Sequence, residues 1–118
     1  MLLLSACSTC KVAKLSSIRE IQFGNGGGFM GTVTTYCLKV DGSLYKQEQM
    51  LKKLTCDSLS IIFELAEQLP KEDFIQPGNT YYFIRLVSRE ASLYYTWTWE
   101  NKPNDKIIEL YTKLSKQL

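Results

Sequence analysis

Cysteine is the side chain with the most chemistry to offer in this sequence, because histidine is absent. The four cysteines are Cys7, Cys10, Cys37 and Cys56. Without histidine, the usual Ser–His–Asp and Cys–His nucleophile systems and all histidine metal sites are excluded. Cys7 and Cys10 form a C-x-x-C pair, but a zinc site needs a second such pair, and a redox motif would follow a strand. The sequence therefore predicts no metal, no cofactor and no enzymatic role.

Cys7 has a different chemical setting from the other three cysteines. The tetrapeptide Leu4-Ser5-Ala6-Cys7 follows an apolar start and resembles the bacterial lipobox, in which the cysteine becomes the lipidated first residue. Several acyl chains, at about 0.8 kcal/mol per buried CH₂, hold a protein on a membrane. The apolar run is short and lacks a basic segment, so we expect the true start upstream of Met1. Residues 1–16 would be a signal remnant, lipobox and tether; the alternative is a short N-terminal strand or tail.

Cys37 and Cys56 form the second candidate pair. In an oxidising envelope compartment two such cysteines can form a disulfide bond, which for a loop of this size contributes about 3–4 kcal/mol in the chain-entropy model. The alternative is two separate buried thiols, which behave as small apolar groups. The sequence leaves both alternatives open.

Glycine is concentrated in one stretch, since five of the seven glycines lie in GNGGGFMG at residues 24–31. The stretch lacks the lysine of a phosphate-binding Walker loop, and a strand pattern follows it where a dinucleotide fingerprint needs a helix. We therefore expect a turn or wide bulge that lets Phe29 fold back on a sheet. The stretch is also the candidate contact loop, comprising Gly24, Asn25, Gly26, Gly27, Gly28 and Phe29.

An aromatic strand pattern, LYYTWTWE, covers residues 93–100. Its alternation places Tyr95, Trp97 and Trp99 on one face, which we expect to be core beneath the helices. The alternative is a stacking platform for sugar or peptide, completed by Tyr81 and Phe83 on the neighbouring strand. The opposite face is a candidate ligand or solvent face, comprising Tyr94, Thr96 and Thr98 beside Tyr82 and Arg85. A group of carboxylates is expected to be a solvated surface, comprising Glu64, Glu67, Glu72 and Asp73.

The elements that position these residues follow from periodicity and turn signals. Strands are expected at residues 18–23, 29–40 and 43–49, with a type I′ turn at Asp41-Gly42. A helix capped by Asp57 or Ser58 should run to Pro70, and a last helix should follow Asp105, with an apolar stripe from Ile107 to Leu118. Between them lie strands at residues 80–88 and 93–100.

The predicted fold class is therefore α+β, an antiparallel sheet of about five strands in the order β-β-β-α-β-β-α, with both helices packed on one face. Residues 17–118 would form a single domain. A hydrophobic content of 45% supports a core, and a net charge of +2 gives no basic surface for nucleic acid. There is no apolar run of 18 residues to span a bilayer.

The sequence resembles small uncharacterised envelope lipoproteins of Gram-negative bacteria. The resemblance lies in the lipobox, in GNGGGFMG with Tyr36 and the Asp41-Gly42 turn, and in residues 77–81 with the tryptophan strand. It implies a location on the cell envelope, at the outer membrane or facing the periplasm, with the membrane reached through lipid on Cys7. The resemblance implies no active-site residues for this sequence.

The leading functional hypothesis is a non-enzymatic binding module, such as an inhibitor or an assembly accessory. Its partner would be an envelope protein or a glycan, and its contact surface the glycine loop with the neighbouring strand edge. One alternative is a small envelope enzyme that works without histidine, through tyrosine, lysine or carboxylates. Others are a sugar- or peptide-binding domain that uses the aromatic strand, and a purely structural envelope protein.

Overall fold

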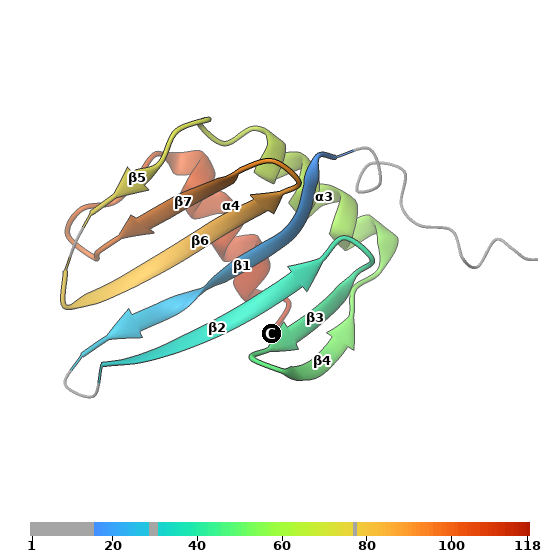
Figure 1. The fold of residues 1–118 in the computed structure, drawn as a ribbon, viewed down its shortest axis with the longest axis horizontal. Coiled ribbons are helices and arrows are strands. Elements are labelled where there is room, and N and C mark those ends of the chain that lie inside the picture. The colour runs from blue at the N-terminus through green and yellow to red at the C-terminus, as the bar shows by residue number, and fades with distance from the viewer. Residues whose placement is uncertain (1–15, 29–30, 77) are drawn as a thin grey trace, which may run out of the picture.

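The structure is a computed structural model, and it describes residues 16–28, 31–76 and 78–118. These residues form seven strands and two helices (Figure 1). The elements in chain order are β1 (Ile18–Gly27), β2 (Thr32–Lys39), β3 (Ser43–Lys46), β4 (Gln49–Lys53), α3 (Cys56–Glu67), β5 (Phe74–Ile75), β6 (Thr80–Ser88), β7 (Ser92–Trp97) and α4 (Asp105–Ser115). The predicted α+β class is confirmed.

All seven strands belong to one sheet, in the order β4-β3-β2-β1-β6-β7-β5. Both helices lie on the same face of this sheet, and the other face carries no helix (Figure 1). The expected five antiparallel strands are wrong in detail. The chain turns at Gln47, whose φ is 55°, and returns as β4, whereas one strand was expected over this region. The two-residue β5 pairs in parallel with β7, so the sheet is mixed.

The core lies between the inner sheet face and the two helices. Strand alternation places Ile21, Phe23, Ile84 and Tyr95 on this face, and each is at most 1% exposed. The helices contribute residues at helical spacing: Leu59, Ile62, Phe63 and Ala66 from α3, and Ile107, Leu110 and Leu114 from α4. Leu118, expected in the α4 stripe, is exposed instead.

Both helices begin directly after a residue whose side chain caps the first turn. Asn104 accepts from the backbone N–H groups of Lys106 and Ile107 and caps α4. Thr55 accepts from the N–H of Ser58 and caps α3, so the expected cap at Asp57 or Ser58 is wrong. Such caps contribute about 1 kcal/mol each, because they satisfy N–H groups that the helix leaves unpaired.

The turn between β2 and β3 also differs from the prediction. The N–H of Gly42 donates to the carbonyl of Lys39 at 2.9 Å, and Gly42 has a φ of 98°. Asp41 does not share the positive φ that a type I′ turn requires at both central residues. Its carboxylate instead accepts from the N–H of Ser43 at 2.9 Å, and this hydrogen bond lowers the pKa of Asp41.

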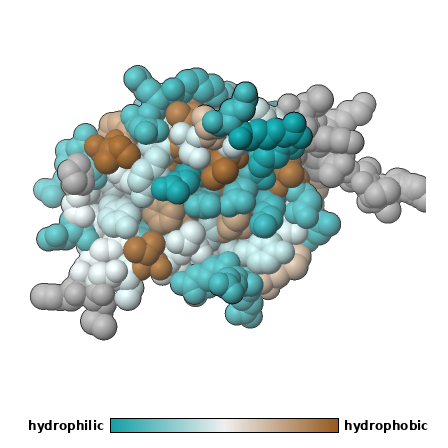
Figure 2. Space-filling model, viewed as in Figure 1, coloured by the Kyte–Doolittle hydropathy of each residue, from teal (hydrophilic) through white to brown (hydrophobic). Residues whose placement is uncertain are grey.

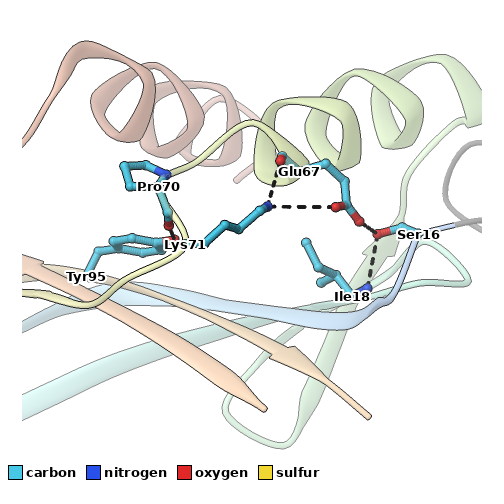
Figure 3. A network of polar contacts seen from close by, with 6 residues as sticks. All are labelled: Ser16, Ile18, Glu67, Pro70, Lys71 and Tyr95. Atoms are coloured by element: carbon cyan, nitrogen blue, oxygen red, sulfur yellow. Dashed lines mark hydrogen bonds and ion pairs between the residues drawn. The ribbon is translucent and has the colours of Figure 1, made fainter. Parts of the chain in front are cut away.

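Polar contacts connect the end of α3 and the residues after it with the start of β1 and with β7 (Figure 3). The hydroxyl of Ser16 donates to the carboxylate of Glu67 and accepts from the N–H of Ile18. The ammonium of Lys71 donates to the Glu67 carbonyl at 2.7 Å, and the Tyr95 hydroxyl donates to the Pro70 carbonyl at 2.5 Å. The segment that precedes β1 therefore enters the fold beside the C-terminal end of α3.

Candidate binding site

An aromatic cluster joins α4 to the inner face of the sheet. The ring of Tyr111 meets Trp97 edge-on at 5.2 Å between centroids, Tyr82 at 5.7 Å and Phe23 at 6.3 Å. Such edge-to-face pairs add about 0.5–1.5 kcal/mol beyond the area that they bury. The cluster therefore fixes the position of α4 over the glycine-rich half of β1.

A cleft opens beside this cluster, with a volume of about 200 Å³. We call it the aromatic cleft, and its lining residues are Tyr82, Trp97, Thr98, Trp99, Lys102, Ile108 and Tyr111. Tyr82 and Trp97 are cross-strand partners on β6 and β7, while Ile108 and Tyr111 come from α4. The cleft thus lies where the sheet ends and the connection to α4 begins.

Trp99 forms the exposed rim of the aromatic cleft. The strand ends at Trp97, and the chain bends so that the N–H of Asn101 donates to the Thr98 hydroxyl at 3.1 Å. The bend leaves Trp99 73% exposed, whereas Trp97 is 4% exposed. The Lys102 ammonium lies 4.8 Å from the centroid of the Trp99 ring. The expectation that Tyr95, Trp97 and Trp99 share one environment is therefore confirmed for the first two only.

Three aromatic residues of β6 and β7 lie on the helix-free face: Tyr81, Phe83 and Tyr94. Phe83 is paired with Thr96, not with Trp97, so Tyr81 and Phe83 do not extend the Trp97 stripe as expected. Phe83 lies 6.3 Å from both Tyr81 and Tyr94. Tyr94 is in turn covered by the Arg85 guanidinium at 4.7 Å. Figure 2 shows this face with many hydrophilic residues between a few separate hydrophobic ones.

The glycine stretch is a strand for most of its length. Gly24 to Gly27 belong to β1, so the expected turn or wide bulge is wrong for these residues. An added Cβ would lie 1.9 Å from the Thr34 carbonyl oxygen at Gly24 and 2.7 Å from the Tyr81 hydroxyl oxygen at Gly26. Close packing therefore requires these glycines.

Only part of the candidate contact loop is open to solvent. Gly24 and Gly26 are buried, and Gly27 is half-buried, while Asn25 and Gly28 are exposed. The N–H of Gly28 donates to the Asn79 carbonyl at 2.8 Å, which joins the β1 end to the segment before β6. Phe29 lies outside the described residues.

The described cysteines do not pair with each other. Cys37 is a free thiol on the helix-free face, and Cys56 is disulfide-bonded. The Cys37–Cys56 disulfide, one of the two alternatives from the sequence, is therefore wrong. Burial and the Glu20 carboxylate raise the pKa of Cys37 to about 12. Cys7 and Cys10 lie outside the described residues.

Ionisable groups are dispersed over the described part of the chain. Glu64, Glu67, Glu72 and Asp73 are exposed, as expected for a solvated surface. The Asp73 carboxylate accepts a hydrogen bond from the N–H of Tyr94 at 2.9 Å. This bond satisfies a backbone donor of β7 just before the residues of β7 that pair with β5. Within residues 16–28, 31–76 and 78–118, no three His, Cys, Asp or Glu side chains come together as a metal site.

Lys102 is a lining residue that no pattern in the sequence singles out, because it lies in a polar turn before the last helix. The expectation that Tyr82 lies beside Tyr94 and Thr96 is wrong, because Tyr82 is paired with Trp97 and lines the aromatic cleft. Tyr111 belongs to the expected apolar stripe of the last helix. No helix of the described residues is long and apolar enough to cross a bilayer. No protein-family model, curated protein or solved structure matches this chain.

Proposed function

We propose that this protein is a lipid-anchored binding module of the bacterial cell envelope, and that the aromatic cleft holds an apolar side chain of a partner protein. The main support is Trp99, which is 73% exposed at the rim of a cleft built from further aromatic rings. Exposed tryptophan beside a preformed pocket is typical of binding hot spots, because one ring buries a large area with little loss of conformational entropy.

The position of the cleft fits attachment through the N-terminal segment. Ile18, where β1 starts, is paired with Ser88 at the end of β6, whereas Tyr82 of the cleft is paired with Asn25 near the other end of β1. The start of β1 and the start of β6 lie at opposite ends of the sheet (Figure 1). Because Tyr82 lies near the start of β6, the aromatic cleft is at the end away from Ile18. A lipid on Cys7 would leave the cleft facing away from the membrane, where a partner can reach it.

The lipobox and the disulfide bond of Cys56 support the proposed location. Disulfides persist in oxidising compartments such as the periplasm and are rare in the cytosol. The resemblance of the N-terminal tetrapeptide to a lipobox specifies the same compartment. Both are arguments for the envelope that do not depend on the cleft.

A binding role fits the described side chains better than an enzymatic one. Cys37 is the described free thiol, and its pKa of about 12 leaves almost none of the nucleophilic thiolate at pH 7. The aromatic cleft is lined by rings, Ile108, Thr98 and Lys102, with no carboxylate for acid–base chemistry. The lining therefore offers mainly apolar contact surface, which supports binding.

The contact surface is tested by capture from envelope extracts with matched variants. The immobilised chain, Trp99→Ala and Ile61→Ala should be compared, because Ile61 is also an exposed apolar residue, at 48%, but lies on α3. We expect a partner that the parent chain and Ile61→Ala retain and Trp99→Ala loses. Identical capture by all three would contradict the role of the cleft.

The anchor requires a separate test with the full-length gene product. Metabolic labelling with an alkynyl fatty acid should label the parent and leave Cys7→Ala unlabelled and released from the membrane fraction. A Cys7→Ala protein that still takes up label would exclude lipidation at Cys7. This result would leave the binding role of the cleft in place.

A further inference from the structure

We propose that the apolar side chain held by the aromatic cleft is an aromatic ring next to a carboxylate, so that the partner presents an acidic aromatic segment. Lys102 would pair with the carboxylate while the ring enters between Trp97, Trp99 and Tyr111. This inference rests on the proposed function of the cleft and names the chemistry of its ligand.

The volume of the cleft limits the apolar part of the ligand to one ring. An apolar cavity of about 150 Å³ is known to hold benzene, whereas pockets for complete small-molecule ligands occupy about 300–1,000 Å³. At about 200 Å³ the aromatic cleft belongs with the first class. It therefore suits a single phenyl, phenol or indole ring from a larger partner.

The chemistry of the walls favours a protein side chain over a sugar. Tyr82, Trp97, Tyr111 and Ile108 present carbon surfaces, and the hydroxyl of Tyr111 is already donated to the Gly24 carbonyl. A sugar ring would lose hydrogen bonds from its hydroxyl groups to water on entering such a site. An aromatic ring would lose none and would meet edges and faces in the arrangements that rings prefer.

The charge at the rim of the cleft is positive. Lys102 is the charged residue of the lining, and Glu100 and Asp105, its nearest acidic neighbours in sequence, are not part of it. Asp105 lies in the first turn of α4, where a negative charge complements the helix dipole. The ammonium of Lys102 has three donors and no acceptor, so it attracts a carboxylate and repels an amine.

The test uses three probes that share one ring and differ in charge: 3-phenylpropionate, 3-phenylpropionamide and 3-phenylpropylamine. Dissociation constants for the 118-residue chain are read from the indole N–H signals of Trp97 and Trp99 in NMR titrations. We expect the acid to bind about two- to fivefold more tightly than the amide at low salt, as for an exposed ion pair, and the amine to bind most weakly. Lys102→Gln and about 1 M salt should both remove the advantage of the acid.

The control variant is Lys106→Gln, because Lys106 is an exposed lysine on α4 whose ammonium contacts Gln68 outside the cleft. It should keep the preference for the acid. Equal binding of the three probes, or a preference unchanged in Lys102→Gln, would overturn the carboxylate inference and leave the cleft as a binding site. No shift with any probe, or shifts with N-acetylglucosamine alone, would overturn the proposed function of the cleft as well.

Discussion

The hydroxyl of Tyr111, on the last helix, donates a hydrogen bond at 3.0 Å to the backbone carbonyl of Gly24, on the first strand. The same ring packs edge-on against Trp97 and Tyr82, and burial raises the pKa of Tyr111. Tyr111 thus joins the glycine stretch, the aromatic cleft and α4. The glycine stretch contributes to the proposed site through the Gly24 carbonyl, which accepts this hydrogen bond.

Substitutions at Tyr111 should separate its hydrogen bond from its ring. Tyr111→Phe should lower the free energy of unfolding by about 0.5–1.5 kcal/mol, because the Gly24 carbonyl loses its donor while the ring stays. Tyr111→Ala should lower it by about 3–5 kcal/mol, since it also removes ring packing. Urea denaturation measures both changes. Equal losses for the two variants would contradict this division.

The glycines of the stretch should differ in their tolerance of a methyl group. In Gly24→Ala the new Cβ would lie 1.9 Å from the Thr34 carbonyl oxygen, so we expect a loss of at least about 3 kcal/mol. Gly28→Ala is the matched control, because a Cβ there meets nothing within 4 Å. Its cost should be about 1–2 kcal/mol, from a φ of 86° alone. Thermal unfolding of both variants decides whether close packing explains Gly24.

The helices and the long strands could be predicted from the sequence because local signals agree there. The α3 and α4 patterns each combine apolar residues at helical spacing with a capping residue or a following proline. The sequence predicts one strand where the structure has the hairpin of β3 and β4, because the turn residues Gln47 and Glu48 are not among the residue types that usually mark a turn. The two residues of β5 are too few for any pattern.

The candidate site was only partly predictable, because it depends on register and on the exact end of a strand. The alternation in residues 93–100 correctly separated Tyr95 and Trp97 from Tyr94, but it could not show that the strand stops before Trp99. The pairing of Tyr82 with Trp97 depends on the connection between β6 and β7, and a shift of one residue would place Phe83 there instead.

Tyr95 should make stability sensitive to alkaline pH. Its hydroxyl donates to the Pro70 carbonyl, and burial raises its pKa from 10.0 to about 12. Because the folded pKa lies above the unfolded one, the contribution of Tyr95 is complete below about pH 10 and is lost as pH rises toward 12. Tyr95→Phe should be less stable at pH 7 by about 0.5–1.5 kcal/mol and should lose less stability between pH 10 and 12. Parallel profiles for parent and variant, measured by urea denaturation, would contradict the assignment.

Cys37 should be chemically quiet in the folded chain. With a pKa of about 12, its thiolate fraction at pH 7 is about 10⁻⁵, against about 3% for an ordinary cysteine, so alkylation should be about a thousandfold slower or more. Glu20→Gln should speed the reaction, because the carboxylate contributes to the raised pKa of Cys37. Mass spectrometry of chains treated with iodoacetamide measures the rates, and denaturation should restore ordinary reactivity.

The same labelling, repeated in denaturant, distinguishes the two described cysteines. Cys37 should be alkylated without reductant, because it is a free thiol, whereas Cys56 should be alkylated only after reduction. Protection of both until reduction would instead indicate that they pair, against the structure. Alkylation of both without reductant would remove the disulfide from the argument for an oxidising compartment, and the proposed location would then depend on the lipobox alone.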